Sequence, residues 1–81
     1  MNPGELANLA VASIYDGVNT WNDSSFEERA IGQQLTMFDT PLLVISVLKR
    51  RNYKPTLVLT NRGRLCWVLD FRLNPIGEVG W

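Results

Sequence analysis

The side chains able to carry out chemistry in this chain are few, and the missing types exclude most enzyme mechanisms. Its 81 residues include no histidine and a single cysteine, Cys66. Imidazole-based proton transfer, a Ser–His pair, imidazole metal ligands and an internal disulfide are therefore ruled out. The sequence also holds no glycine-rich phosphate loop, paired-carboxylate motif or cluster of metal ligands. We expect a non-catalytic protein that uses no cofactor and no metal.

Basic side chains are the strongest remaining candidates for a binding function. Residues 49–72 carry seven basic residues against one acidic residue, a net charge of +6, whereas residues 1–48 carry six acidic residues against one basic residue. This asymmetry indicates a surface suited to an anionic partner such as nucleic-acid phosphate, although the same residues would also serve to solvate a helix end and a hairpin. The candidate phosphate-binding residues are Lys49, Arg50, Arg51, Lys54, Arg62 and Arg64.

Helix start signals precede three segments of the chain. Asn2 followed by Pro3 is typical of an N-cap and a first helical position. Overlapping Ser-x-x-Glu capping boxes begin at Ser24, and Asp39 stands two residues before Pro41. These signals predict helices over residues 3–16, 24–35 and 41–52, the first of them ending at Gly17.

The segment of residues 41–48 allows two interpretations. It is rich in β-branched and other aliphatic side chains, so it is compatible with a buried strand covered on both faces. The capping residues before it and the Lys49-Arg50-Arg51 run after it favour a helix. The helical interpretation gives three helices followed by a β-hairpin (αααββ). The other gives two helices followed by a three-stranded antiparallel meander (ααβββ).

A β-hairpin is predicted in the second half of the chain. Residues 56–60 and 65–71 have strand composition, and Asn61-Arg62-Gly63-Arg64 between them is typical of a turn. Cys66 lies in the middle of the second strand and is expected to pack there. Residues 73–81 show no regular pattern, so we expect an irregular tail that ends in Trp81.

The order of three helices followed by a β-hairpin (αααββ) resembles that of a winged helix-turn-helix domain, which is an α+β fold. In that family, apolar and small residues at fixed separations hold the helix pair together. The residues at those separations here are Ile31, Gly32, Leu35, Met37, Leu42 and Ile45. The resemblance covers residues 6–71 and implies one winged-helix-like domain over residues 1–72. It also implies that the hairpin is the wing, with Arg62 and Arg64 at its tip contacting phosphates.

The predicted third helix departs from the family on its outer face. Leu43, Val44 and Val47 stand where base-reading side chains would be, and they form no hydrogen bonds with bases. Exposed aliphatic side chains need a cover. We therefore expect these three residues, together with Trp81, to contact a protein such as a DNA-bound repressor or a second copy of the chain. The hypothesis is a small corepressor-type regulator of transcription, similar to the accessory proteins of phages and plasmids.

Two other functions stay open. A protein-interaction module or inhibitor would not bind nucleic acid, and would use its acidic half, including Asp23 and Glu27, or its Trp81 tail. An RNA-binding module would stack a base on Tyr53 beside Lys54. A single tyrosine among basic residues is more typical of a side chain that packs beneath a hairpin.

No segment of the sequence has the character of a membrane span or a secretory signal. The longest uncharged apolar run, residues 41–48, is far shorter than the roughly 20 residues that span a bilayer. The first residues lack the basic-then-apolar order of a signal peptide. A lone cysteine is typical of a reducing compartment. We expect a cytoplasmic protein with no membrane partner.

Overall fold

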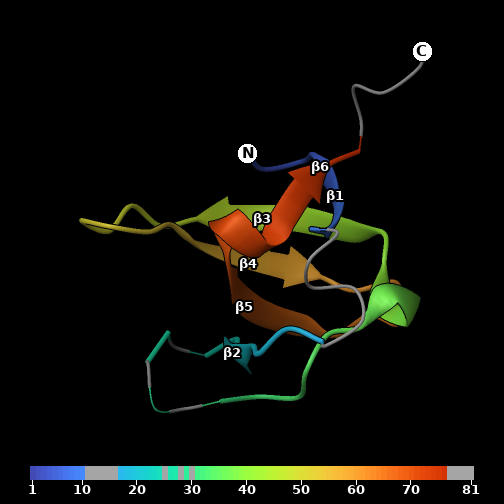
Figure 1. Ribbon diagram of the computed structural model, residues 1–81, viewed down its shortest axis with the longest axis horizontal. Coiled ribbons are helices and arrows are strands. Elements are labelled where there is room, and N and C mark those ends of the chain that lie inside the picture. Colours follow the sequence, from blue (N-terminus) through green and yellow to red (C-terminus); the bar gives the residue numbers. More distant parts are fainter. Residues whose placement is uncertain (11–16, 25, 28, 30, 77–81) are drawn as a thin grey trace.

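The computed structural model describes residues 1–10, 17–24, 26, 27, 29 and 31–76, and these form a six-stranded antiparallel sheet (Figure 1). The strands follow the order β2-β5-β4-β3-β1-β6 across the sheet. Two short 3-10 helices, η2 (Met37–Asp39) and η3 (Asp70–Arg72), lie between strands. The strands are β1 (Leu6–Leu9), β2 (Trp21–Asn22), β3 (Leu42–Val47), β4 (Pro55–Leu59), β5 (Leu65–Leu69) and β6 (Leu73–Pro75).

The predicted hairpin is present and occupies the middle of the sheet. β4 pairs with β5 in a register that places Val58 opposite Cys66. The turn is closed by the Thr60 amide, which donates to the Arg64 carbonyl at 2.8 Å, and Gly63 supplies the positive φ of +83° that the turn requires. The second strand ends at Leu69, two residues earlier than predicted, because η3 begins at Asp70.

Residues Leu42–Val47 form the strand β3, so the helix predicted over residues 41–52 is wrong. The acidic residue that was interpreted as its cap belongs to η2 instead. The carboxylate of Asp39 accepts a hydrogen bond from the Thr36 amide at 2.9 Å, which closes a capping box within the 3-10 helix. β3 then pairs with both β4 and β1. Its β-branched residues therefore act as strand formers.

The first predicted helix is also wrong. Its start signal is a turn, in which the Glu5 amide donates to the Asn2 carbonyl at 3.2 Å and the Asn2 side chain donates to the Glu5 carboxylate at 3.4 Å. The chain then enters β1, which lies between β3 and β6. Residues 11–16 of this predicted helix lie outside the described residues.

The second predicted helix, over residues 24–35, is wrong as well. Residues 25, 28 and 30 lie outside the description, and the described remainder is not helical. Ile31 bridges to Trp21, and Leu35 bridges to Val18. No α-helix occurs anywhere in the described residues. The αααββ and ααβββ folds are therefore both incorrect, and so is the winged helix-turn-helix architecture.

One face of the sheet carries a closed aliphatic core. Alternate residues of the central strands point into it, including Val44 of β3, Val58 of β4 and Val68 of β5. A β-bulge between Val44 and Ser46 shifts the alternation by one, so that Val47 also packs against the core. The buried core residues are Ala7, Leu9, Val18, Leu35, Leu42, Val44, Val58, Cys66, Val68 and Leu73.

Three buried threonines bring polar groups into this interior, and each is hydrogen-bonded. Thr60 Oγ1 accepts from the amides of Arg62 and Arg64, while the hydroxyls of Thr56 and Thr20 donate to backbone carbonyls. Satisfied hydroxyls avoid the cost of burying an unpaired polar group. Of the three, Thr56 and Thr60 lie at the two ends of β4, where the β3–β4 and β4–β5 loops leave the sheet.

The beginning of the predicted tail is ordered. Residues 73–75 form β6 on β1, and Leu73 is buried, whereas residues 77–81, including Trp81, lie outside the description. Among the described residues no helix has the length and apolar character needed to cross a membrane.

The strand assignment of β3 predicts that the same substitution destabilises the protein by very different amounts at two neighbouring positions. Val44 is 1% exposed and Ile45 is 39% exposed. Val44→Glu places an unpaired carboxylate in the core, so we expect the free energy of unfolding to fall by about 3 kcal/mol or more. Ile45→Glu should cost less than about 1 kcal/mol. Urea denaturation followed by tryptophan fluorescence measures both, and equal losses would contradict the placement of this strand.

Candidate nucleic-acid interface

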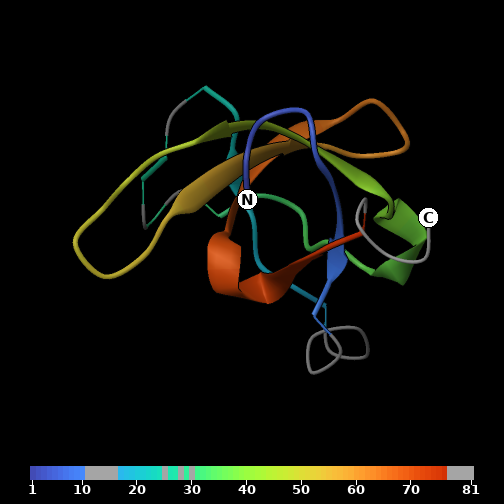
Figure 2. The ribbon, with the colours of Figure 1, turned by 90° about the horizontal axis from the view of Figure 1, so that it is seen from above.

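The sheet separates the predicted phosphate-binding residues into two groups. Lys49, Arg50, Arg51 and Lys54 belong to the β3–β4 loop, at the start of β4, whereas Arg62 and Arg64 belong to the β4–β5 turn at its end. The two loops extend from opposite ends of the sheet (Figures 1 and 2). The six basic residues therefore do not form one surface.

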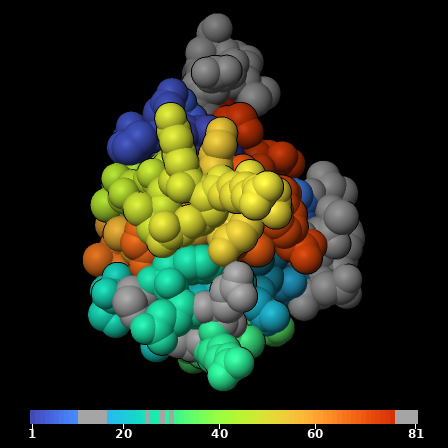
Figure 3. All heavy atoms as spheres, turned by 90° about the vertical axis from the view of Figure 1, so that its left-hand side faces the viewer, coloured from blue at the N-terminus to red at the C-terminus, as the bar shows by residue number. Residues whose placement is uncertain are grey.

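The β3–β4 loop carries the denser positive charge. Its residues 48–54 include four basic residues and no acidic residue, and all four basic side chains are exposed. Two backbone hydrogen bonds shape the loop: the Leu48 amide donates to the Pro55 carbonyl at 2.8 Å, and the Arg50 amide donates to the Tyr53 carbonyl at 3.0 Å. In Figure 3 the loop, in yellow, projects from the centre of one end of the molecule.

Asp70 fixes the base of this loop. Its carboxylate Oδ1 accepts a hydrogen bond from the Lys54 amide at 3.1 Å, and its own amide donates to the Lys54 carbonyl at 3.1 Å. The loop is thereby attached to η3, which carries Phe71 and Arg72. The Arg72 guanidinium lies 5.0 Å from the centre of the Phe71 ring, a cation–π distance.

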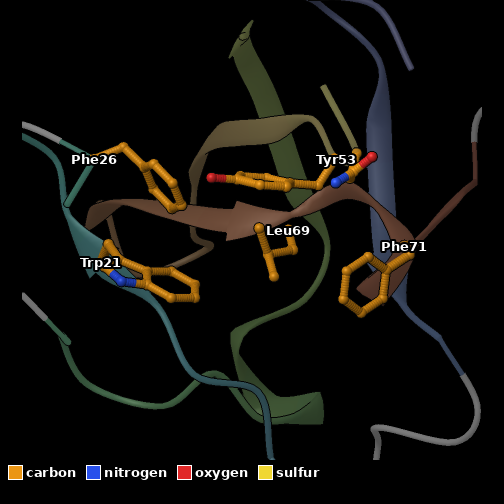
Figure 4. Close-up of a pocket in the computed structure, with 6 residues that line it drawn as sticks. Trp21, Phe26, Tyr53, Leu69 and Phe71 are labelled. Carbon is orange, nitrogen blue, oxygen red and sulfur yellow. The ribbon is translucent and has the colours of Figure 1, made fainter. Parts of the chain in front are cut away.

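An aromatic cavity of about 320 Å³ lies next to the base of the loop. Figure 4 shows Trp21 and Phe26 together on one side, Phe71 on the other, and Tyr53 and Leu69 between them. The lining comes from four places in the chain: β2, the segment after it, the β3–β4 loop and the β5–η3 junction. The residues that line it are Trp21, Phe26, Asn52, Tyr53, Leu69 and Phe71.

Phe26 is the common neighbour of the ring cluster. Its ring centre lies 5.0 Å from that of Trp21, 6.1 Å from that of Tyr53 and 6.4 Å from that of Trp67. The three ring pairs are inclined at 53–67°, so none of them is a parallel stack. Trp67 stands directly opposite Trp21 across the β2–β5 pair. The cluster thus covers the face of β5 that turns away from the aliphatic core.

The second basic group consists of Arg62 and Arg64 on the β4–β5 turn, and Arg64 has a structural role. Arg64 is half-buried, its Nη1 donates to Gln33 Oε1, and its Nη2 is buried without a hydrogen-bond partner among the described residues. It lines a separate, more polar cavity of about 220 Å³ together with Thr20 and Cys66. Arg62 is exposed on the turn. The pair therefore does not form the tip of a wing, and only Arg62 presents its charge openly.

The residues predicted to contact a protein do not share a surface. Val44 is buried and Val47 packs against the same core, while the half-buried Leu43 lies on the opposite face between Leu6 and Leu59. The outer helix face that was expected to make the protein contact is therefore not present, because Leu42–Val47 is a strand. Trp81 lies outside the described residues.

Sequence reasoning missed most of the aromatic cavity. The sequence places Tyr53 beside basic residues, but it placed Phe26 within a predicted helix and Phe71 at the end of a predicted strand. One feature of the sequence does point toward the cavity: Trp67, Leu69 and Phe71 alternate along the chain, which indicates that the hairpin has a second apolar face. Nothing local in the sequence places Trp21 across from Trp67.

The described residues hold no group of three or more potential metal ligands. Comparisons with protein-family models, curated proteins and solved structures find no match for the chain.

The thiol of Cys66 is buried in the core, and burial raises its pKa above the ordinary value of 9.0, with the Arg64 guanidinium partly opposing the shift. A raised pKa in the folded state favours the protonated thiol there. The thiol therefore contributes to the free energy of unfolding at pH values below its pKa in the unfolded chain. This contribution is lost as the pH rises through the pKa of the thiol in the folded protein. The thiol is thus expected to remain protonated at neutral pH and to act in packing.

This shift predicts a pH dependence of stability. As the pH rises from 8 to 10, the free energy of unfolding should fall more steeply for the native chain than for Cys66→Ala, by at most about 1.4 kcal/mol per pH unit. Urea denaturation at a series of pH values measures both slopes. Because other titrating groups are common to the two proteins, identical slopes would show that the thiol is not perturbed.

Proposed function

We propose that the protein is a small non-catalytic module that binds nucleic acid through the β3–β4 loop, with Lys49, Arg50, Arg51 and Lys54 contacting phosphates. The observation that carries this proposal is the exposure of four basic side chains on one loop that has no acidic residue. Phosphate contacts of this kind supply affinity without reading sequence. A cytoplasmic location, which the single cysteine favours, belongs to the same proposal.

The loop is suited to this role by its attachment. Two hydrogen bonds hold the base of the loop against η3: the Lys54 amide donates to the Asp70 carboxylate, and the Asp70 amide donates to the Lys54 carbonyl. The Lys49, Arg50 and Arg51 side chains are exposed to solvent. A hairpin that is fixed at its base places its charges in one region and loses less conformational freedom on binding than a disordered basic tail. A role in regulating transcription is compatible with this surface, without the repressor-contacting helix expected from the sequence.

A protein-binding module that avoids nucleic acid is the second candidate. It is favoured by η2, where Phe38 is 70% exposed and Met37 is 52% exposed. These apolar side chains lie near the β4–β5 turn, because the Asn61 amide group donates to the Phe38 carbonyl at 2.9 Å. This surface is remote from the basic loop, so the two functions are separable by mutation.

The proposal predicts salt-dependent binding that depends on the loop. Four phosphate contacts give a slope of log Kobs against log salt of about −3. Arg50→Gln with Arg51→Gln should make this slope shallower by roughly 1.5, because two of the contacts are lost. Fluorescence anisotropy with a labelled oligonucleotide, titrated at several salt concentrations, measures the affinity and the slope.

The matched control is Arg29→Gln with Arg62→Gln, which removes the same charge from two exposed positions outside the loop. We expect its slope and affinity to stay close to those of the native chain. Equal losses in the two double variants would show that net charge, and not the β3–β4 loop, drives binding. An absence of binding at low salt would refute the proposal.

A further inference from the structure

We infer that the aromatic cavity beside the loop receives an unpaired base, so that the protein prefers single-stranded nucleic acid to a duplex. The inference rests on the proposed function of the β3–β4 loop and assigns its substrate class. The cavity and the basic loop share a continuous stretch of chain, since Asn52 and Tyr53 line the cavity and Lys54 follows them directly.

The cavity has the size and chemistry for one planar ring system. Its volume of about 320 Å³ lies at the lower end of the roughly 300–1,000 Å³ that small-molecule sites occupy. Four of its six lining residues are aromatic, and Asn52 adds an amide that both donates and accepts hydrogen bonds. Because Phe71 is 58% exposed and Asn52 is exposed, the cavity is accessible from the end of the molecule that carries the loop.

Charge complementarity selects a nucleotide base as the occupant. Tyr53 lines the cavity and the exposed Lys54 follows it in the chain, so a nucleotide whose base enters the cavity lies near a basic side chain that can contact its phosphate. Arg50 and Arg51 are then available to neighbouring phosphates. Arg72 adds a further guanidinium beside Phe71. An uncharged apolar ligand would make no use of these cations.

A duplex cannot occupy the cavity without losing pairing and stacking. Its bases are paired and stacked inside the helix, whereas a single strand exposes base faces to aromatic side chains. Stacking of this kind tolerates any base, because every base has a π-face. The loop alone would bind both forms through their phosphates. The cavity therefore adds affinity only for the single strand.

The test compares oligo(dT), oligo(rU) and a DNA duplex as probes in anisotropy titrations at fixed low salt. For Tyr53→Ala and Phe71→Ala we expect a loss of roughly 5- to 150-fold for the two single strands and little change for the duplex. Tyr53→Phe keeps the ring and should retain most of the affinity. Phe38→Ala removes an exposed phenylalanine outside the cavity and serves as the matched control.

The possible outcomes separate the two proposals. A selective loss of single-strand binding in both cavity variants, each with a native thermal unfolding transition, supports the inference. Equal binding of all three probes, unaffected by the cavity variants but reduced by the Arg50→Gln/Arg51→Gln change, overturns base capture and leaves the loop function standing. Binding of none of the probes overturns both. If Tyr53→Ala fails to fold, the exposed Phe71 position decides the result.

Discussion

The alternation of side chains along β4 and β5 is the constraint from which the other features follow. Successive residues of a strand point to opposite faces, so Cys66 and Val68 enter the aliphatic core while Trp67 and Leu69 face the other way. β2 pairs with β5 and places Trp21 opposite Trp67. The sheet thus has a closed aliphatic face and an aromatic face, and the second is available for binding because only part of it is covered.

The proposed site depends on where the central strands end. The loop between β3 and β4 leaves the sheet next to the point where β5 passes into η3, because these ends are adjacent in the antiparallel order. Asp70 joins them through two backbone-directed hydrogen bonds to Lys54. As a result, Tyr53 from the loop and Phe71 from η3 border one cavity, and the basic side chains lie beside it. The proposed phosphate contacts and the proposed base stacking would therefore involve one continuous surface.

Local patterns predicted the hairpin, and they misled in the first half of the chain. The strand composition and the Asn61–Arg64 turn were sufficient for β4 and β5. The Asn2–Glu5 signal was misinterpreted because a turn satisfies the same backbone groups as a helix N-terminus. β1 alternates as a strand does, with Leu6 42% exposed and both Ala7 and Leu9 buried in the core. The cavity was not predictable, since Trp21, Phe26, Tyr53 and Phe71 meet only through pairing of distant strands.

The central claim is that the β3–β4 loop and the aromatic cavity form one site. A titration of ¹⁵N-labelled protein with oligo(dT), followed by two-dimensional amide NMR, tests it most directly. We expect shifts at residues 49–54 and 70–72 and at the indole N–H of Trp21, with residues 61–64 unchanged. Shifts centred on residues 61–64 or 37–39, with an unperturbed loop, would contradict it.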